Sequence, residues 1–144
     1  MTYNQREHFR VYLQIPLAAM CRIVGIANKP SETNYAQIAL KDISLGGARM
    51  HSKLDFPLHA NLLLEISFTV IEQKYKILGT IVRKTLVNSS LYEYGIKFII
   101  ADASTEQQFM KHLNIFSVRL RDTNVLGSCS FCTEEELESI YVGE

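Results

Sequence analysis

The stretch that decides the fold runs from residue 62 to residue 98 and reads LLLEISFTVIEQKYKILGTIVRKTLVNSSLYEYGIKF. Apolar residues take every second position in three segments of it, which predicts three strands with one buried face each. The Asn88–Ser90 segment predicts a hairpin turn between the last two strands. Short strands joined by turns indicate an antiparallel barrel or sandwich. The three apolar faces consist of Leu62, Leu64, Ile66 and Phe68; of Tyr75, Ile77, Gly79 and Ile81; and of Tyr92, Tyr94, Ile96 and Phe98.

Further strands are predicted upstream of this stretch. Residues 9–15 and 36–40 alternate in the same way, and residues 18–27 form an apolar run compatible with a strand. Pro16 is expected to interrupt the first strand, because proline cannot donate a backbone hydrogen bond. The composition of residues 28–34 predicts a loop.

The period changes to that of a helix near residue 104. Ser104 followed by Gln107 fits a capping box, which predicts the start of a helix. The stripe beyond it fits a helix that lies against the barrel and covers an end or an edge. Its apolar residues are Phe109, Leu113, Phe116 and Leu120.

The chain is long enough for one domain of ordinary size. We expect that domain over residues 1–121 and a C-terminal extension over residues 122–144. Thr133 and Glu136 form a second capping box, which predicts a short acidic helix in the extension.

Charge and composition exclude several classes of protein. Fifteen basic and fifteen acidic side chains give a formal net charge of zero, which disfavours a protein that coats DNA or RNA. No segment has the roughly 18 consecutive apolar residues of a membrane span. The polar N-terminus is unlike a signal peptide, so a cytoplasmic location is expected. No P-loop, Gly-x-Ser-x-Gly elbow, His-Glu-x-x-His motif or clear carboxylate pair indicates an enzyme.

Three cysteines are too few and too scattered for a disulfide framework. Cys129 and Cys132 form a C-x-x-C pair, but the second pair that a structural zinc site needs is missing. We therefore expect no metal and no cofactor. The pair is structural or incidental in this interpretation, with a redox pair as the alternative.

Arg6 and Arg10 are the first candidate binding residues. A separation of four places both guanidinium groups on one face, in an extended or a helical segment. Arginine pairs bidentately with phosphate oxygens and with the O6 and N7 atoms of guanine. Two surface arginines that happen to be four apart are the alternative.

The second candidate is the segment from Asp42 to Gly47, which reads D-x-S-x-G-G. On an extended backbone the Asp42 carboxylate and the Ser44 hydroxyl point the same way, so both can contact a guanine. Gly46 and Gly47 permit positive φ and a close approach of the backbone to a ligand. The alternative is an ordinary turn at the end of a strand.

These motifs, followed by a Tyr-Gly-Ile-Lys-Phe strand at residues 94–98 and a helix, resemble the PilZ domain family. The resemblance covers residues 4–121. It implies a mainly β fold: a six-stranded antiparallel (split) β-barrel with a C-terminal α-helix. It also implies binding of the bacterial second messenger cyclic di-GMP.

The resemblance assigns roles to the motif residues. Arg6 and Arg10 would grip guanine bases and phosphates, and Asp42 and Ser44 would hold guanine and phosphate from the barrel surface. Gly47, beside Gly46, would let the backbone approach the ligand.

In the family, the residue before the first arginine is related to whether one ligand or a stacked pair is bound. It is Gln5 here, which favours a single dinucleotide. Arg22, Arg49 or Lys97 could still supply a further cation.

The function expected from this resemblance is that of a cyclic di-GMP receptor. Ligand would draw the residue 1–10 arm onto the barrel, and an unidentified protein partner would read the changed surface. Motility, biofilm, exopolysaccharide and virulence control are the outputs that the family implies. The chain would be a monomer or homodimer without nucleic-acid polymer or membrane span. The alternative is an adaptor domain with the same barrel that works without nucleotide.

Overall fold

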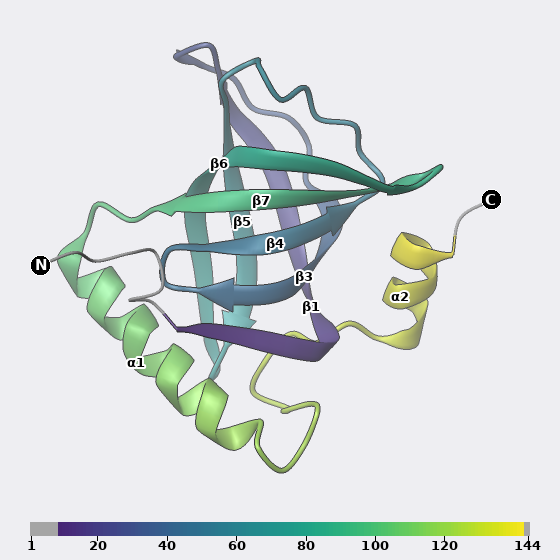
Figure 1. Ribbon diagram of the computed structural model, residues 1–144. Helices are drawn as coiled ribbons and strands as arrows, with labels where there is room; N and C mark the ends of the chain where they lie inside the picture. Colours follow the sequence, from purple (N-terminus) through teal and green to yellow (C-terminus); the bar gives the residue numbers. More distant parts are fainter. Residues whose placement is uncertain (1–8, 143–144) are drawn as a thin grey trace, which may run out of the picture.

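The computed structural model describes residues 9–142, which form a barrel of strands flanked by two helices (Figure 1). The strands are β1 (Arg10–Ile26), β2 (Lys29–Pro30), β3 (Ala36–Ser44), β4 (Gly47–Ser52), β5 (Leu62–Val70), β6 (Gln73–Asn88) and β7 (Leu91–Ile99). The helices are α1 (Ala103–Arg119) and α2 (Glu134–Tyr141). No helix in this part of the chain is both long and apolar enough to span a membrane.

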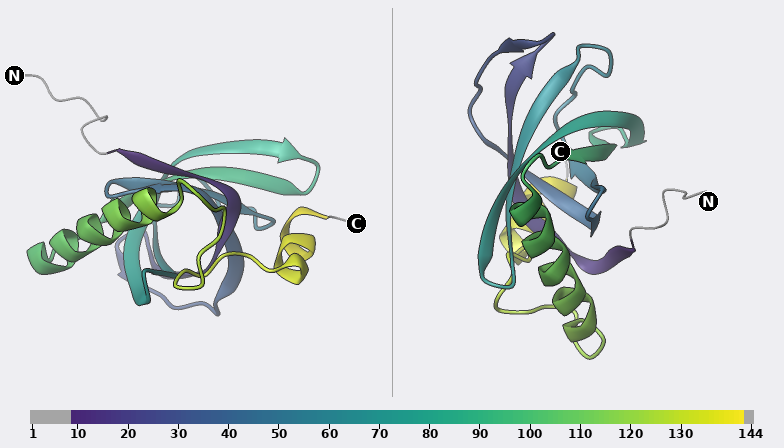
Figure 2. Two further views of the ribbon diagram at one scale, coloured as in Figure 1. Left: turned by 90° about the horizontal axis from the view of Figure 1, so that it is seen from below. Right: turned by 90° about the vertical axis from the view of Figure 1, so that its left-hand side faces the viewer.

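The strands close into a ring. Their order is β2-β1-β3-β4-β7-β6-β5, and β1 also pairs with β5 at the other end of that order. All pairings are antiparallel. The two-residue β2 pairs only with the end of β1, with which it forms a short hairpin. The predicted six-stranded antiparallel barrel is therefore confirmed, and the sandwich is excluded. Seen from below, α1 and α2 lie on opposite sides of the ring (Figure 2).

Strand β1 closes the ring because it changes partner along its length. Residues 10–12 and 17–21 pair with β3, and residues 20–26 pair with β5. Between Tyr12 and Leu17 the register shifts, and this irregularity contains Pro16. The expected interruption at Pro16 is thus a bulge inside one long strand rather than a break between two, because a bulge tolerates a residue without an amide hydrogen.

The predicted apolar faces form the core. All four residues from the Leu62–Phe68 face are buried, together with most of those from the other two faces. Helix α1 closes the lower end of this core with Phe109, Leu113 and Phe116, which are fully or almost fully buried. The helix cap is Asp102, two residues before the expected Ser104, and the Asp102 side chain accepts from the Ser104 amide, so the predicted Ser104–Gln107 capping box is wrong.

The turn considered as the alternative for residues 42–47 and the loop expected at residues 28–34 both differ from the structure in their extent. Asp42 and Ser44 belong to the end of β3, so the turn consists of Leu45 and Gly46 alone. The expected loop at residues 28–34 contains β2, which pairs with the end of β1. The predicted hairpin turn at Asn88–Ser90 is confirmed between β6 and β7.

The segment from residue 122 to residue 142 is attached to the barrel along the bulge of β1. The Ala18 amide donates to the Ser130 carbonyl at 2.6 Å, and the Cys132 amide donates to the Pro16 carbonyl at 2.9 Å. These bonds give partners to backbone groups of β1 at its bulge and just beyond it. Helix α2 follows with the predicted Thr133–Glu136 capping box, which is confirmed. It packs on the outer face of the barrel through Ile140.

Candidate ligand-binding site

A buried carboxylate with an arginine on each side forms the centre of the candidate site. Asp42 is only 3% exposed, although it lies on the outer face of β3. Its Oδ1 accepts from Arg10 Nη1 at 2.6 Å, and its Oδ2 accepts from Arg49 Nε at 2.9 Å. Because β3 pairs with β1 and with β4, the two arginines come from the neighbouring strands. The carboxylate holds two guanidinium groups side by side at the surface.

A third guanidinium group lies beside this pair. Arg83 on β6 lies opposite Gly95 on β7, and a Cβ at Gly95 would come within 3.2 Å of the Arg83 Cζ. The missing side chain therefore lets Arg83 lie flat across β7. Arg10, Asp42, Arg49 and Arg83 line a surface hollow of about 380 Å³, which Tyr12, 69% exposed, also borders.

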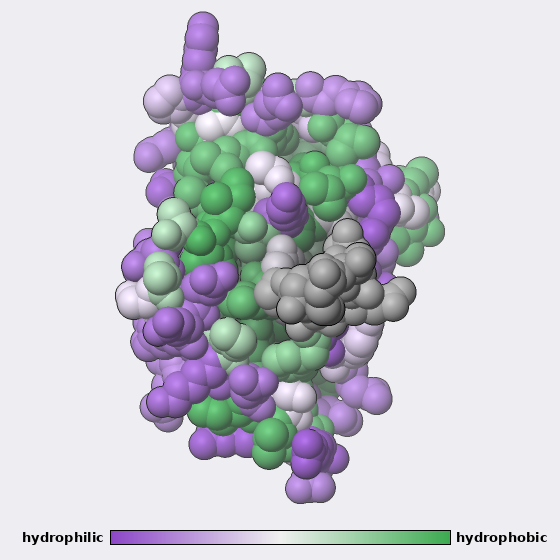
Figure 3. Space-filling model, turned by 60° about the vertical axis from the view of Figure 1, so that its left-hand side comes forward, coloured by the Kyte–Doolittle hydropathy of each residue, from purple (hydrophilic) through white to green (hydrophobic). Residues whose placement is uncertain are grey.

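A second hollow, of about 530 Å³, adjoins the first. Both are lined by Arg10, Val82 and Ile96, so they meet at the Arg10 side chain. The second extends over the β3–β4 turn to Lys97 and to Glu106 at the start of α1. Figure 3 shows a face of the molecule on which hydrophobic side chains gather between hydrophilic ones. The two hollows offer cations, apolar surface and an aromatic ring to a ligand.

Ser44 and Gly47 build the turn beneath the second hollow. The Ser44 hydroxyl accepts from the Gly47 amide and donates to the Gly47 carbonyl, both at 3.2 Å. Neither Gly46 nor Gly47 has a positive φ, so that part of the sequence interpretation is wrong. Gly47 is required for packing instead: a Cβ there would lie 2.0 Å from the Ile96 carbonyl oxygen.

The structure brings most of the predicted site residues to one face. Arg10, Asp42, Ser44, Gly46 and Gly47 border the two hollows. The predicted ligand residues Gln5 and Arg6 lie outside the described residues.

The three residues named as possible further cations lie in different places. Arg49 lies in the first hollow and Lys97 borders the second. Arg22 lies elsewhere, where it pairs with Glu65 at 3.0 Å and stacks on Tyr35.

Sequence reasoning missed Arg83 and Tyr12. The hairpin turn at Asn88–Ser90 was the available signal for Arg83, because a turn sets the register of its strands. A regular hairpin would place Lys84 opposite Gly95, but a bulge between Leu86 and Asn88 places Arg83 there.

A chain of polar side chains leads from Arg49 to the C-terminal helix. Arg49 Nη1 lies 3.7 Å from Glu93 Oε1, which lies 2.8 Å from His51 Nε2. His51 Nδ1 in turn lies 2.8 Å from the Tyr141 hydroxyl on α2. Burial lowers the pKa of His51 below its ordinary value, and the Lys41 and Arg49 charges add to this against the opposing effect of Glu93.

This pKa shift predicts a loss of stability in mild acid. Below pH 6.5, the ordinary pKa of histidine, the unfolded chain binds a proton at His51 that the folded chain resists. The free energy of unfolding should therefore fall as the pH drops through this range. Urea unfolding from pH 8 to pH 5.5 should show a smaller fall in His51→Gln, which keeps a hydrogen-bonding side chain. His112, whose pKa burial also lowers, contributes equally to both proteins. Equal pH profiles for the two proteins would contradict the assignment.

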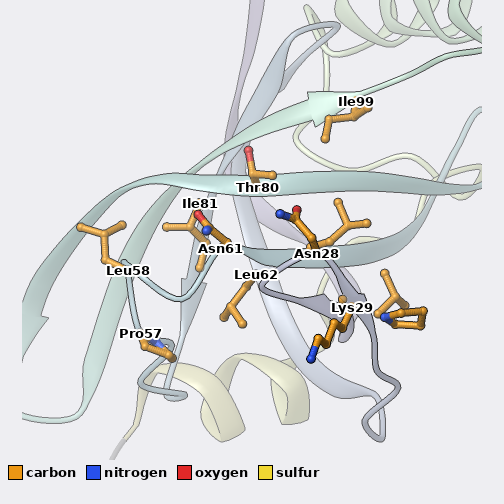
Figure 4. A pocket seen from close by; sticks show the side chains of 13 residues that line it. Asn28, Lys29, Pro57, Leu58, Asn61, Leu62, Thr80, Ile81 and Ile99 are labelled. Carbon is orange, nitrogen blue, oxygen red and sulfur yellow. The ribbon is translucent and has the colours of Figure 1, made fainter.

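A larger cavity, of about 680 Å³, lies away from the motif residues. It is bordered by the β1–β2 hairpin, the loop before β5 and the middle of β6 (Figure 4). Asn28, Asn61 and Thr80 supply polar groups to it, and Lys29 is the charged residue in its lining. It therefore lacks the paired guanidinium groups of the candidate site.

The C-x-x-C pair is packed against the barrel. The Ile71 amide donates to Cys129 Sγ at 3.4 Å, and burial raises the pKa of Cys132 to about 11. A high pKa keeps that thiol protonated and unreactive. Among residues 9–142 no group of three or more histidine, cysteine or carboxylate side chains has the arrangement of a metal site.

Solved structures with a similar fold include bacterial regulators. The PilZ domain of YcgR from Escherichia coli, solved with c-di-GMP, has a TM-score of 0.58 and 16% identity, covering 83% of this chain and 96% of that one. The K. pneumonia MrkH–c-di-GMP complex has a TM-score of 0.59 and 17% identity, covering 84% and 56%. The Bacillus subtilis inhibitor of motility MotI/DgrA has a TM-score of 0.61 and 13% identity, covering 83% and 54%.

At these identities the likeness concerns the fold. This chain spans about half the length of the MrkH structures that it matches. No curated protein matches the sequence. The sequence model of the PilZ domain matches residues 4–114, well over half of the chain. The chain therefore belongs to the PilZ domain family.

Proposed function

We propose that this protein is a receptor for cyclic di-GMP, bound at the face formed by β1, β3, β4 and β6. The observation that carries the proposal is the buried Asp42 carboxylate, which holds Arg10 and Arg49 at a hollow that Arg83 also lines. Two of the similar structures, YcgR and MrkH, were solved with c-di-GMP, which supports the same ligand here.

The charges and shapes of the site suit this ligand. Cyclic di-GMP carries two phosphates and two guanine bases. Arg10, Arg49 and Arg83 outnumber the one buried carboxylate among them, so the hollow favours a dianion. Guanidinium groups bind phosphate oxygens and guanine O6 and N7 in pairs of hydrogen bonds. The exposed ring of Tyr12 offers a surface on which a base can stack.

The geometry revises the role of Asp42 within this proposal. Both of its oxygens already accept from arginines, so its main task is to position Arg10 and Arg49 rather than to bind guanine. Ser44 and Gly47 support the turn below the ligand. Arg6 is assigned to the ligand by the sequence motif alone.

Isothermal titration of the purified chain against three nucleotides tests the proposal. Cyclic di-GMP should bind with a dissociation constant in the micromolar range or below, at one dinucleotide per chain. Cyclic di-AMP has the same phosphates but lacks guanine O6, so it should bind about tenfold more weakly. GMP controls for binding of a single guanine nucleotide. The proposal fails if saturating cyclic di-GMP produces neither heat nor a thermal shift.

The receptor would pass the signal to another macromolecule, with a protein as the expected partner. Catalysis and a resident cofactor form no part of this proposal, and cyclic di-GMP should be recovered unchanged after incubation. A cytoplasmic location is part of the proposal, because cyclic di-GMP is an intracellular messenger. If a partner were captured equally well by wild type and by a variant without Arg6 and Arg10, the nucleotide-independent adaptor would be favoured.

A further inference from the structure

We propose that helix α2 sets the ligand affinity of the Arg10–Arg49 site, because Tyr141 and His51 hold the Glu93 carboxylate back from Arg49. This inference rests on the proposed function and adds a control element to it. Tyr141, His51 and Glu93 are positioning residues here, since they act on the ligand through Arg49.

The contacts form one continuous path from the helix to the site. Tyr141 is the last residue of α2, and its hydroxyl lies 2.8 Å from His51 Nδ1 on β4. His51 Nε2 lies 2.8 Å from Glu93 Oε1 on β7. Arg49, two residues before His51 on the same face of β4, reaches Asp42, and through it Arg10.

The direction of each hydrogen bond in this path is fixed by chemistry. An ionised carboxylate only accepts, so His51 Nε2 must donate its hydrogen to Glu93. In a neutral imidazole the other nitrogen then accepts, so the Tyr141 hydroxyl donates to Nδ1. Glu93 thus selects the tautomer, and the bond from Tyr141 to Nδ1 holds the imidazole ring in the orientation that presents Nε2–H to Glu93.

The path decides how strongly Glu93 competes for Arg49. Glu93 Oε1, bonded to His51, stays 3.7 Å from Arg49 Nη1, which is beyond hydrogen-bond distance. Without His51 held in this orientation, the carboxylate is free to form a direct bond to Arg49. That bond would compete with a ligand phosphate for the same guanidinium group.

Coupling of this kind works in both directions. If docked α2 favours ligand, bound ligand must favour docked α2 by the same factor. A phosphate that draws Arg49 away from Glu93 leaves His51 as the partner of the carboxylate, and so strengthens the link to Tyr141.

Removal of one hydroxyl tests the path without removing the helix. Ile140, 4% exposed, packs α2 onto Ala39 and Leu91, and this apolar contact remains in Tyr141→Phe. Titration should show cyclic di-GMP binding about fivefold more weakly to Tyr141→Phe than to wild type, as expected for loss of one hydrogen bond in a coupled network.

Two further variants make this result specific. Glu93→Gln removes the competing charge, so it should bind ligand more tightly and should no longer respond to Tyr141→Phe. Tyr35→Phe is the matched control, because it also removes a tyrosine hydroxyl that bonds another side chain, here Glu65, outside the path. An equal affinity change in Tyr35→Phe and Tyr141→Phe would overturn the proposal.

Hydrogen exchange of residues 134–142 gives a second readout that also works without ligand. Arg49→Gln frees Glu93 for His51, so exchange in α2 should slow about fivefold, whereas Arg22→Gln should leave it unchanged. In wild type, saturating cyclic di-GMP should slow the same amides. Unchanged exchange in Arg49→Gln overturns the coupling even if the wild type binds ligand normally. Failure of the wild type to bind ligand, with slowed exchange in Arg49→Gln, would overturn the proposed function alone.

Discussion

Cyclic di-GMP binding is expected to weaken about 100-fold when Arg10 is replaced with alanine. Arg10 borders both hollows, and its guanidinium group is held at 2.6 Å from a carboxylate that is almost fully buried. Removal of one partner from a positioned charge pair at a binding interface costs about 3 kcal/mol, which corresponds to this factor. Titration of Arg10→Ala at fixed salt measures the loss.

Two variants separate this effect from general loss of charge. Arg10→Lys keeps the charge but not the planar fork, so its loss of affinity should be intermediate. Arg22→Ala removes an arginine that also pairs with a carboxylate, outside both hollows, and should bind as the wild type does. A change of less than threefold in Arg10→Ala would place the ligand elsewhere on the molecule.

Gly47→Ala is expected to destabilise the fold by about 3 kcal/mol. An added Cβ would lie 2.0 Å from the Ile96 carbonyl oxygen, in a sheet where Gly47 pairs with Lys97. The backbones of β4 and β7 must move apart to admit it, which breaks ladder hydrogen bonds in the barrel wall. Thermal unfolding should show a midpoint about 10 °C lower than that of the wild type.

Gly127→Ala is the matched control for this substitution. A Cβ at Gly127 meets no atom within 4 Å, so the same change in side chain should leave the midpoint within about 2 °C. A wild-type midpoint for Gly47→Ala would show that the two strands can separate without cost. The motif glycine would then be explained by the ligand rather than by packing.

The barrel could be predicted in outline because its strands have simple patterns. The alternating faces at 62–68, 75–81 and 92–98 predict the inward residues, and the stripe from Phe109 to Leu120 predicts the helix that covers them. The course of β1 could not be predicted from alternation. Its bulge shifts the register around Pro16. The strand also pairs first with β3 and then with β5, so its apolar residues do not follow one regular alternation.

The candidate site could be predicted only in part, for a related reason. Asp42 and Arg10 belong to short motifs, so their spacing is visible in the sequence. Arg49 and Arg83 reach the site through strand pairing, and the position of Arg83 depends on a bulge. The packing role of Gly47 could not be predicted, because a close contact between strands leaves the same glycine in the sequence as a positive φ does.

The closure of the ring between β1 and β5 has a consequence for the order of folding. β1 leaves the ribosome before the other strands of the barrel, yet the residues that pair with its second half lie at positions 62–67. That half has to wait, with its apolar residues exposed, until most of β5 has been synthesised. Pairing across so long a loop is also slow, because the chain loses the entropy of loop closure before the stabilising contacts form. We therefore expect closure of the β1–β5 seam to limit the folding rate, and nascent chains that end before residue 67 to depend most on chaperones.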